Sequence, residues 1–168
     1  RRSSDLVVKN RQTRAEDAGM ELIENQIYDN NMLNHKVLLF LLNPGEIDKN
    51  IAGLIANKIT AKYQRPCCIL TKVQKNIHHT YDEFPNVVVD EYITTYEGSA
   101  RGCDKVGINE FKNICEQTGV INYAVGHQGA FGLGILASEI NNFIKKTDNI
   151  LKDMADEAIY YVDYIWNV

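Results

Sequence analysis

Apolar residues recur at helical spacing early in the chain and then gather into short runs. Residues 11–33 carry small and aliphatic side chains three or four positions apart, with acidic residues on the other faces, which predicts a helix. Residues 36–42 are predicted as a buried strand, because the residues from Val37 to Leu42 form a continuous apolar run. A second helix is predicted from a cap at Asp48 or Asn50 to the Arg65-Pro66 pair, because the residue before proline disfavours helical geometry.

The apolar run at residues 67–70 completes a succession of strand, helix and strand with short links. This order predicts a βαβ unit with two parallel strands. Residues 73–85 are polar, and we expect an exposed loop or hairpin tip there. The rest of the chain predicts strands at 87–89, 92–96 and 120–124, a short helix at about 109–117, a last helix capped by Ser138 and a terminal strand at 160–166. The expected fold class is α/β, a single domain with a mixed sheet flanked by helices.

Composition limits the classes of function. The 168 residues are 45% hydrophobic and 24% charged with a net charge of −4, as in an ordinary globular domain. Global charge therefore does not predict nucleic-acid binding, and any anion site has to be a local basic patch. The four cysteines form no Cys-x-x-Cys pair, and three lie in apolar runs, so we expect buried thiols and a cytoplasmic location. No apolar run is long enough to cross a membrane. The chain begins without methionine, and we expect a piece of a longer protein.

Two glycine-containing segments are the strongest candidates for a binding site, and both are predicted as turns at strand ends. The first is Gly98-Ser99-Ala100-Arg101, and the second runs from Val125 through Gly126, His127 and Gln128 to Gly132. Glycine lets a backbone approach a ligand, and a guanidinium offers a two-pronged donor to phosphate. The alternatives are that Arg101 is a solvated surface residue and that His127 bonds a backbone carbonyl. The glycine spacing matches neither a Walker loop nor a dinucleotide-binding fingerprint.

Two further sites are weaker candidates. Lys58 lies on the second predicted helix and joins the site only if that helix faces the same groove as Arg101. Otherwise it is an ordinary solvated lysine. The pair His78-His79 lies in a polar stretch with Asp82 and Glu83 as its nearest acids in the sequence, and we interpret it as surface charge rather than a metal site.

The order of these pieces resembles the accessory domain that follows the catalytic domain in DHH-family phosphoesterases, in particular the RecJ-like single-strand-specific exonucleases. The resemblance covers about residues 10 to 150. Residues 98–101 match a Gly-Ser-x-Arg segment, and residues 125–133 match a Gly-Gly-His motif followed by small residues and Gly-Leu. The chain departs from the family at Val125, which replaces the first glycine, and at Gln128, which replaces a small residue. Residues 50–53 stand in place of a Gly-x-x-Gly pattern.

The resemblance implies a division of the chain and of the labour. Residues 1–33 would be an interdomain connector helix, residues 34–157 a DHH-associated substrate-binding domain, and residues 158–168 a terminal strand or the start of a following module. The family's catalytic domain holds two metal ions, Mn²⁺ or Mg²⁺, on aspartates and an Asp-His-His motif. Residues 77–79 read Ile-His-His and lack the aspartate, so we expect no cofactor on this chain and no nuclease activity from it alone.

The resemblance also implies roles for the candidate residues. Ser99 and Arg101 would bind a backbone phosphate of single-stranded DNA or a short oligonucleotide. His127, with the amides around Gly126 and Gln128, would bind the scissile or terminal phosphate and is a candidate stabiliser of transition-state charge. The expected partner is the DHH catalytic domain of the same polypeptide, in DNA repair and recombination. Two alternatives stay open: the accessory domain of an oligoribonuclease or cyclic-dinucleotide phosphodiesterase, and a non-catalytic module that binds nucleic acid or another protein.

Overall fold

A computed structural model describes residues 2–152. Its elements are α1 (Arg2–Asp29), the 3₁₀ turn η1 (Met32–Asn34), β1 (Leu38–Leu42), α2 (Lys49–Tyr63), β2 (Cys67–Tyr81), β3 (Phe84–Arg101), η2 (Asp104–Val106), α3 (Phe111–Gln117), β4 (Ile121–His127), β5 (Ala130–Leu136), η3 (Ala137–Glu139) and a last helix over residues 140–152. The terminal strand predicted at 160–166 lies outside the described residues.

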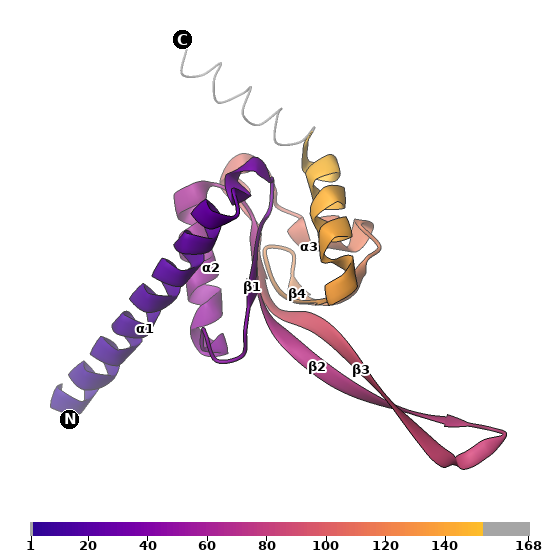
Figure 1. Ribbon diagram of the computed structural model, residues 1–168. Helices are drawn as coiled ribbons and strands as arrows, with labels where there is room; N and C mark the ends of the chain where they lie inside the picture. Colours follow the sequence, from indigo (N-terminus) through magenta and orange to yellow (C-terminus); the bar gives the residue numbers. More distant parts are fainter. Residues whose placement is uncertain (1, 153–168) are drawn as a thin grey trace.

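The five strands form one mixed sheet in the order β1-β2-β3-β5-β4. Strands β1 and β2 are parallel, with Leu38 opposite Cys67, and every other neighbouring pair is antiparallel. Helices α1 and α2 lie on one side of the sheet, and α3 and the last helix lie on the other (Figure 1). The predicted α/β class, mixed sheet and βαβ start are confirmed.

Each side of the sheet has its own hydrophobic core. Successive residues of a strand point to opposite faces, so β1 contributes Leu38, Phe40 and Leu42 to one core and Leu39 to the other. Burial on both faces explains why this strand is a continuous apolar run rather than an alternating one. All four cysteines are buried and free, and burial raises the pKa of the Cys67 and Cys68 thiols well above the usual range. The prediction of buried thiols is therefore confirmed.

Helix α2 begins and ends at the predicted places. The Asp48 side chain accepts a hydrogen bond from the Asn50 amide at 2.8 Å, which decides between the two candidate caps. At the other end, Gln64 has a left-handed backbone with φ of 54°, which turns the chain toward Pro66 and β2.

The prediction of an exposed loop or hairpin tip at 73–85 is confirmed only for the tip: the turn lies at residues 82–83, and most of the stretch is strand. Residues 72–81 of β2 and 84–94 of β3 pair only with each other among the described residues and form a two-stranded arm that projects from the sheet (Figure 1). Its side chains are mostly exposed on both faces, so no alternation of apolar and polar residues marks it in the sequence. Cross-strand ion pairs join His78 to Asp90 at 2.6 Å and His79 to Glu91 at 2.9 Å.

Both terminal helices differ from the predicted bounds. Helix α1 ends at Asp29, before the predicted end at 33, and a short 3₁₀ turn follows. Its residues 3–15 are all exposed and extend beyond α2, whereas Ile23 and Ile27 are buried against it. Ser138 does not stand as a cap directly before the last helix, because it lies inside η3.

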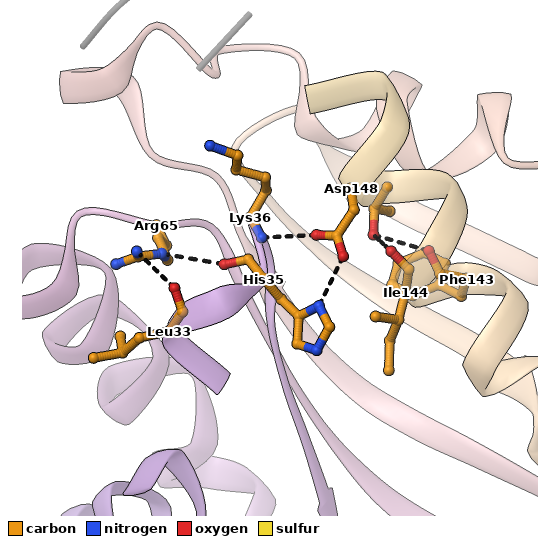
Figure 2. A network of polar contacts seen from close by, with 8 residues as sticks. Leu33, His35, Lys36, Arg65, Phe143, Ile144 and Asp148 are labelled. Atoms are coloured by element: carbon orange, nitrogen blue, oxygen red, sulfur yellow. Dashed lines mark hydrogen bonds and ion pairs between the residues drawn. The ribbon is translucent and has the colours of Figure 1, made fainter. Parts of the chain in front are cut away.

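A network of polar contacts ties the entry of β1 to the last helix (Figure 2). The Asp148 carboxylate accepts a hydrogen bond from the Lys36 amide at 2.8 Å and contacts His35 Nδ1 at 2.7 Å. The Arg65 guanidinium donates to the carbonyl oxygens of Leu33 at 3.0 Å and His35 at 3.2 Å. The Asp148 contacts join segments more than a hundred residues apart, so they fix the position of the last helix relative to the start of β1.

We expect Asp148→Ala to lower the free energy of unfolding by about 1–2 kcal/mol, because a backbone amide and an imidazole lose their shared acceptor. Urea denaturation measures this. Asp148→Asn keeps one acceptor oxygen and should lose less than the alanine variant. Equal stability of both variants and the wild type would show that the network contributes nothing.

Candidate functional site

One region of the sheet is left uncovered by the described helices. Helix α2 packs on β2 and β3, and the same side of β5 and β4 has no helix over it. Register places nine residues on this side, three from each of three strands. We call them the open face: Glu97, Ser99 and Arg101 of β3, Ala130, Gly132 and Gly134 of β5, and Tyr123, Val125 and His127 of β4.

The middle strand of the open face carries only small side chains. Arg101, Ala130 and His127 are opposite one another across β3, β5 and β4, and Ser99, Gly132 and Val125 form the next row. Above Gly132 an added Cβ would meet nothing closer than 3.8 Å. Because two strand spacings separate β3 from β4, the Arg101 and His127 backbones lie about 10 Å apart with a low floor between them.

The Arg101 guanidinium is half-buried at the end of β3 and lies against Gly53 of α2, where a Cβ would overlap Nη2. Its Nη1 donates one hydrogen bond, to the Ala100 carbonyl at 2.9 Å. Among the described residues no carboxylate pairs with it. A guanidinium has five N–H donors, so Arg101 retains donors for an anion.

The predicted turn at 98–101 was wrong, because these residues lie inside β3. Gly98 pairs with Leu70 of β2 and with Leu133 of β5, and Arg101 pairs with Cys67 and Ala130. The next amide, of Gly102, donates to the Gly129 carbonyl at 3.0 Å. The backbone around Ser99 and Arg101 therefore serves the sheet, and the side chains are what this segment offers a ligand.

Ser99 is half-buried and lines a cavity of about 850 Å³ beside the start of α2. The cavity also contacts Asp48, Lys49 and Asn50 at the helix start and Tyr123 on β4. The described residues give the Ser99 hydroxyl no hydrogen-bond partner. Ser99 and Arg101 point to the same side of the sheet.

His127 is exposed at the end of β4, and its ring has no partner among the described residues. Gly126 precedes it with φ of 133°, and a Cβ there would lie 2.9 Å from the Ala130 carbonyl oxygen and from Phe131 Cα. The hairpin therefore requires glycine at 126 for its backbone. Val125, which departs from the family motif, is 69% exposed on the open face and fills no core position.

The side chains of Gln128 and Lys58 have partners away from the other candidates, although the Gln128 backbone directly follows His127. The Gln128 side chain accepts from the Asn113 amide at 3.0 Å and donates to the Asn113 side chain at 2.9 Å, so it holds the start of α3. Lys58 lies five residues beyond Gly53, about 140° around the axis of α2, and pairs with Glu16 of α1 at 2.7 Å. Hydrogen bonding to Glu16 raises the pKa of Lys58.

Sequence reasoning missed Tyr123, whose ring lies over Gly134 so closely that a Cβ on Gly134 would overlap it. Beside it, Lys75 Nζ and Glu97 Oε1 form an ion pair of 2.6 Å. Burial raises the pKa of Tyr123, and the negative charge of Glu97 raises it further. The positive charge of Lys75 opposes this rise in part. The alternation of Tyr123, Val125 and His127 along β4 was the pattern that could have placed it on one face with His127.

The described residues contain no group of three or more His, Cys, Asp or Glu side chains placed to hold a metal ion. His78 and His79 pair with Asp90 and Glu91 across the arm, rather than with Asp82 and Glu83. Within residues 2–152, no helix has the length and apolar character needed to span a bilayer.

Comparison with known proteins supports the resemblance. No family model matches the chain. Over 158 residues, 94% of its length, the chain is 27% identical to YorK of Bacillus subtilis strain 168, a protein named as an SPbeta prophage-derived single-strand DNA-specific exonuclease. It has the same identity, over the same length, to the single-strand DNA-specific exonuclease yorK of Bacillus phage SPbeta. The chain spans 25% of the length of these relatives.

The fold matches part of a solved structure, RecJ from Thermus thermophilus in complex with Mn²⁺. The TM-score is 0.52 at 12% identity, over 84% of this chain and 17% of that one. The sequence relatives and this shared fold agree with the motif order along β3, β4 and β5. The chain is therefore similar in sequence to single-strand DNA-specific exonucleases and shares its fold with part of RecJ, as expected for a RecJ-like DHH-associated domain.

Proposed function

We propose that this domain binds single-stranded DNA on its open face and serves as the substrate-binding part of a RecJ-like exonuclease. The observation that carries the proposal is the Arg101 guanidinium, half-buried against Gly53 with one hydrogen bond and no carboxylate partner in the described residues. A positive charge held in place without a counterion fits a ligand that is an anion. Ser99 supplies a neighbouring hydroxyl from the same strand and the same face.

The arrangement suits a strand rather than a duplex. Small residues of β5 let a chain lie close to the sheet between β3 and β4, and Arg101 and His127 flank it at one end. Arg101 and Ser99 hold one backbone phosphate. His127, on the other side of β5, holds the scissile or terminal phosphate. Because the residues of β5 are small, a single strand can lie over β5 with its bases turned toward the side chains of β3 and β4.

Hydrolysis belongs to another part of the polypeptide. The resemblance assigns Mn²⁺ or Mg²⁺ to a catalytic domain, and the described residues of this chain offer no donor set that fits such an ion. We therefore assign binding and orientation to this chain and no metal-dependent step. His127 is the residue placed to meet the transferred phosphate when a catalytic domain closes over the open face.

An NMR titration tests the proposal. The ¹⁵N-labelled chain is mixed with oligothymidylate at low salt, and the amide and Arg101 Nε–H resonances are followed. We expect shifts on β3, β5 and β4 of the open face and at Arg101. Shifts confined to the arm or to α3 would contradict the proposal. Oligouridylate and a cyclic dinucleotide, run in parallel, test the two related substrate classes, and a Mn²⁺ nuclease assay should show no cleavage by the chain.

Gly53→Ala separates positioning of Arg101 from stability. A Cβ at Gly53 would overlap the end of the Arg101 side chain, which is free to shift, whereas alanine favours the helix by up to about 1 kcal/mol. We expect unchanged or higher stability together with oligothymidylate affinity several-fold below wild type. Fluorescence anisotropy and thermal denaturation measure the two effects. Wild-type affinity in this variant would show that the observed guanidinium position does not matter.

A further inference from the structure

The ring of Tyr123 has an unusual setting on the open face. It rests against Gly134, the residue opposite it on β5, and 40% of the residue stays exposed. Gly134 leaves room for the ring to lie down on the sheet, where any larger side chain would lift it. The ring therefore rests against the backbone of β5, and the exposed part of the residue is open to a ligand.

The ring borders the cavity beside the open face. That cavity, of about 850 Å³, reaches from Tyr123 past Ser99 to the start of α2. Its volume is of the size that small-molecule ligands occupy. The one carboxylate of the open face, Glu97, is paired with Lys75, and the carboxylate of Asp48 at the far end of the cavity accepts a hydrogen bond from the Asn50 amide.

Tyr123 and His127 lie on the same face of β4, four residues and about 13 Å apart. The cationic end of the open face, with Arg101, is thus separated from its aromatic end along the strand direction. A phosphate at Arg101 and a base at Tyr123 belong to different nucleotides of one strand. This division matches single-strand binding, in which cations follow the backbone and aromatic rings stack on bases.

We propose that Tyr123 forms a nucleobase-binding subsite, in which a base of the single strand stacks on the ring and enters the cavity toward Ser99. The inference rests on the proposed function and adds to it a residue outside both glycine-containing motifs. Stacking does not require a particular base, so the subsite is sequence-tolerant. The phenol hydroxyl lies at the edge of the ring, and stacking does not depend on it.

Fluorescence of 2-aminopurine, which is quenched when the base stacks, tests the subsite. Single-stranded oligonucleotides carrying one 2-aminopurine at successive positions are titrated with the chain. We expect quenching at one position with wild type and with Tyr123→Phe, and its loss with Tyr123→Leu. Affinity of Tyr123→Leu should fall roughly 5- to 150-fold, while the dependence of affinity on salt stays unchanged because no charge is removed.

Two further variants test whether the quenching depends on the position of the Tyr123 ring. Gly134→Ala leaves the tyrosine in place but pushes its ring away from the sheet, and we expect the same loss of quenching. Val88→Ala removes an exposed apolar side chain from the arm, away from the open face, and should leave quenching intact. Full affinity and quenching in Tyr123→Leu would overturn the subsite alone. Absence of salt-dependent binding by the wild type would overturn the subsite and the proposed function together.

Discussion

Gly98→Ala is expected to lower the free energy of unfolding by at least about 3 kcal/mol. Gly98 lies on β3 in the middle of the sheet, opposite Leu70 on one side and Leu133 on the other. A Cβ there would overlap the Ile69 carbonyl oxygen and would stand 3.0 Å from Leu70 Cα. These are backbone atoms of the neighbouring strand, so the overlap cannot be removed by turning a side chain. The hydrogen-bonded backbones of β2 and β3 would have to move apart.

Urea denaturation followed by circular dichroism measures the effect. Gly132→Ala is the matched control, since it adds the same methyl group on the adjacent strand, where the nearest atoms are 3.8 Å away. We expect the control to change stability by less than about 1 kcal/mol. Similar stability in the two variants would show that β3 can move away from β2 at Gly98 without a loss of stability.

This contrast changes how the glycine-containing segments are understood. In the sequence, Gly98 is predicted to let a ligand approach the backbone, whereas in the structure its lack of a side chain lets β2 and β3 pack. Gly126 likewise serves the hairpin of β4 and β5. Gly132 is the position where the backbone stays open toward a ligand. Glycine in a strand signals close approach, but the sequence does not say whether the approaching group is a neighbouring strand or a substrate.

The sequence predicted the βαβ start well because burial there follows simple rules. A continuous apolar run marks β1, and Asp48 and the Arg65-Pro66 pair delimit α2. The extension of β2 along the arm was missed because this part of the strand is stabilised by cross-strand pairs such as His78 with Asp90, which lie twelve residues apart. Exposed strands that pair only with each other carry no periodic apolar signal.

The candidate site was predicted in part for a related reason. Ser99, Arg101 and His127 follow from motifs, and register places them on one face of the sheet. The contact of Gly53 with Arg101 joins residues nearly fifty positions apart, so no local sequence pattern predicts it. Lys58 and Gln128 had suitable chemistry, but their partners Glu16 and Asn113 become visible only in three dimensions.

Arg101→Gln is expected to lower the affinity for oligothymidylate by about 10- to 150-fold, the loss of a hydrogen-bonded charge at a phosphate. The reason is that the guanidinium, which lies against Gly53, donates a hydrogen bond only to the Ala100 carbonyl in the described structure, so its charge is available to a ligand. If Arg101 neutralises one phosphate, the slope of log affinity against log salt falls by roughly 0.7. Arg101→Lys retains the charge without the planar fork, so it should keep the slope and recover part of the affinity.

The matched control is Lys58→Gln, which makes the same change in net charge on the opposite side of α2. Because Lys58 pairs with Glu16, its loss should leave both the affinity and the salt slope near the wild-type values. An equal fall in slope for both variants would mean that general charge, rather than a phosphate site at Arg101, governs binding. A fall for Arg101→Gln alone would locate the phosphate at the end of β3, where the half-buried guanidinium has no carboxylate among residues 2–152 to neutralise it.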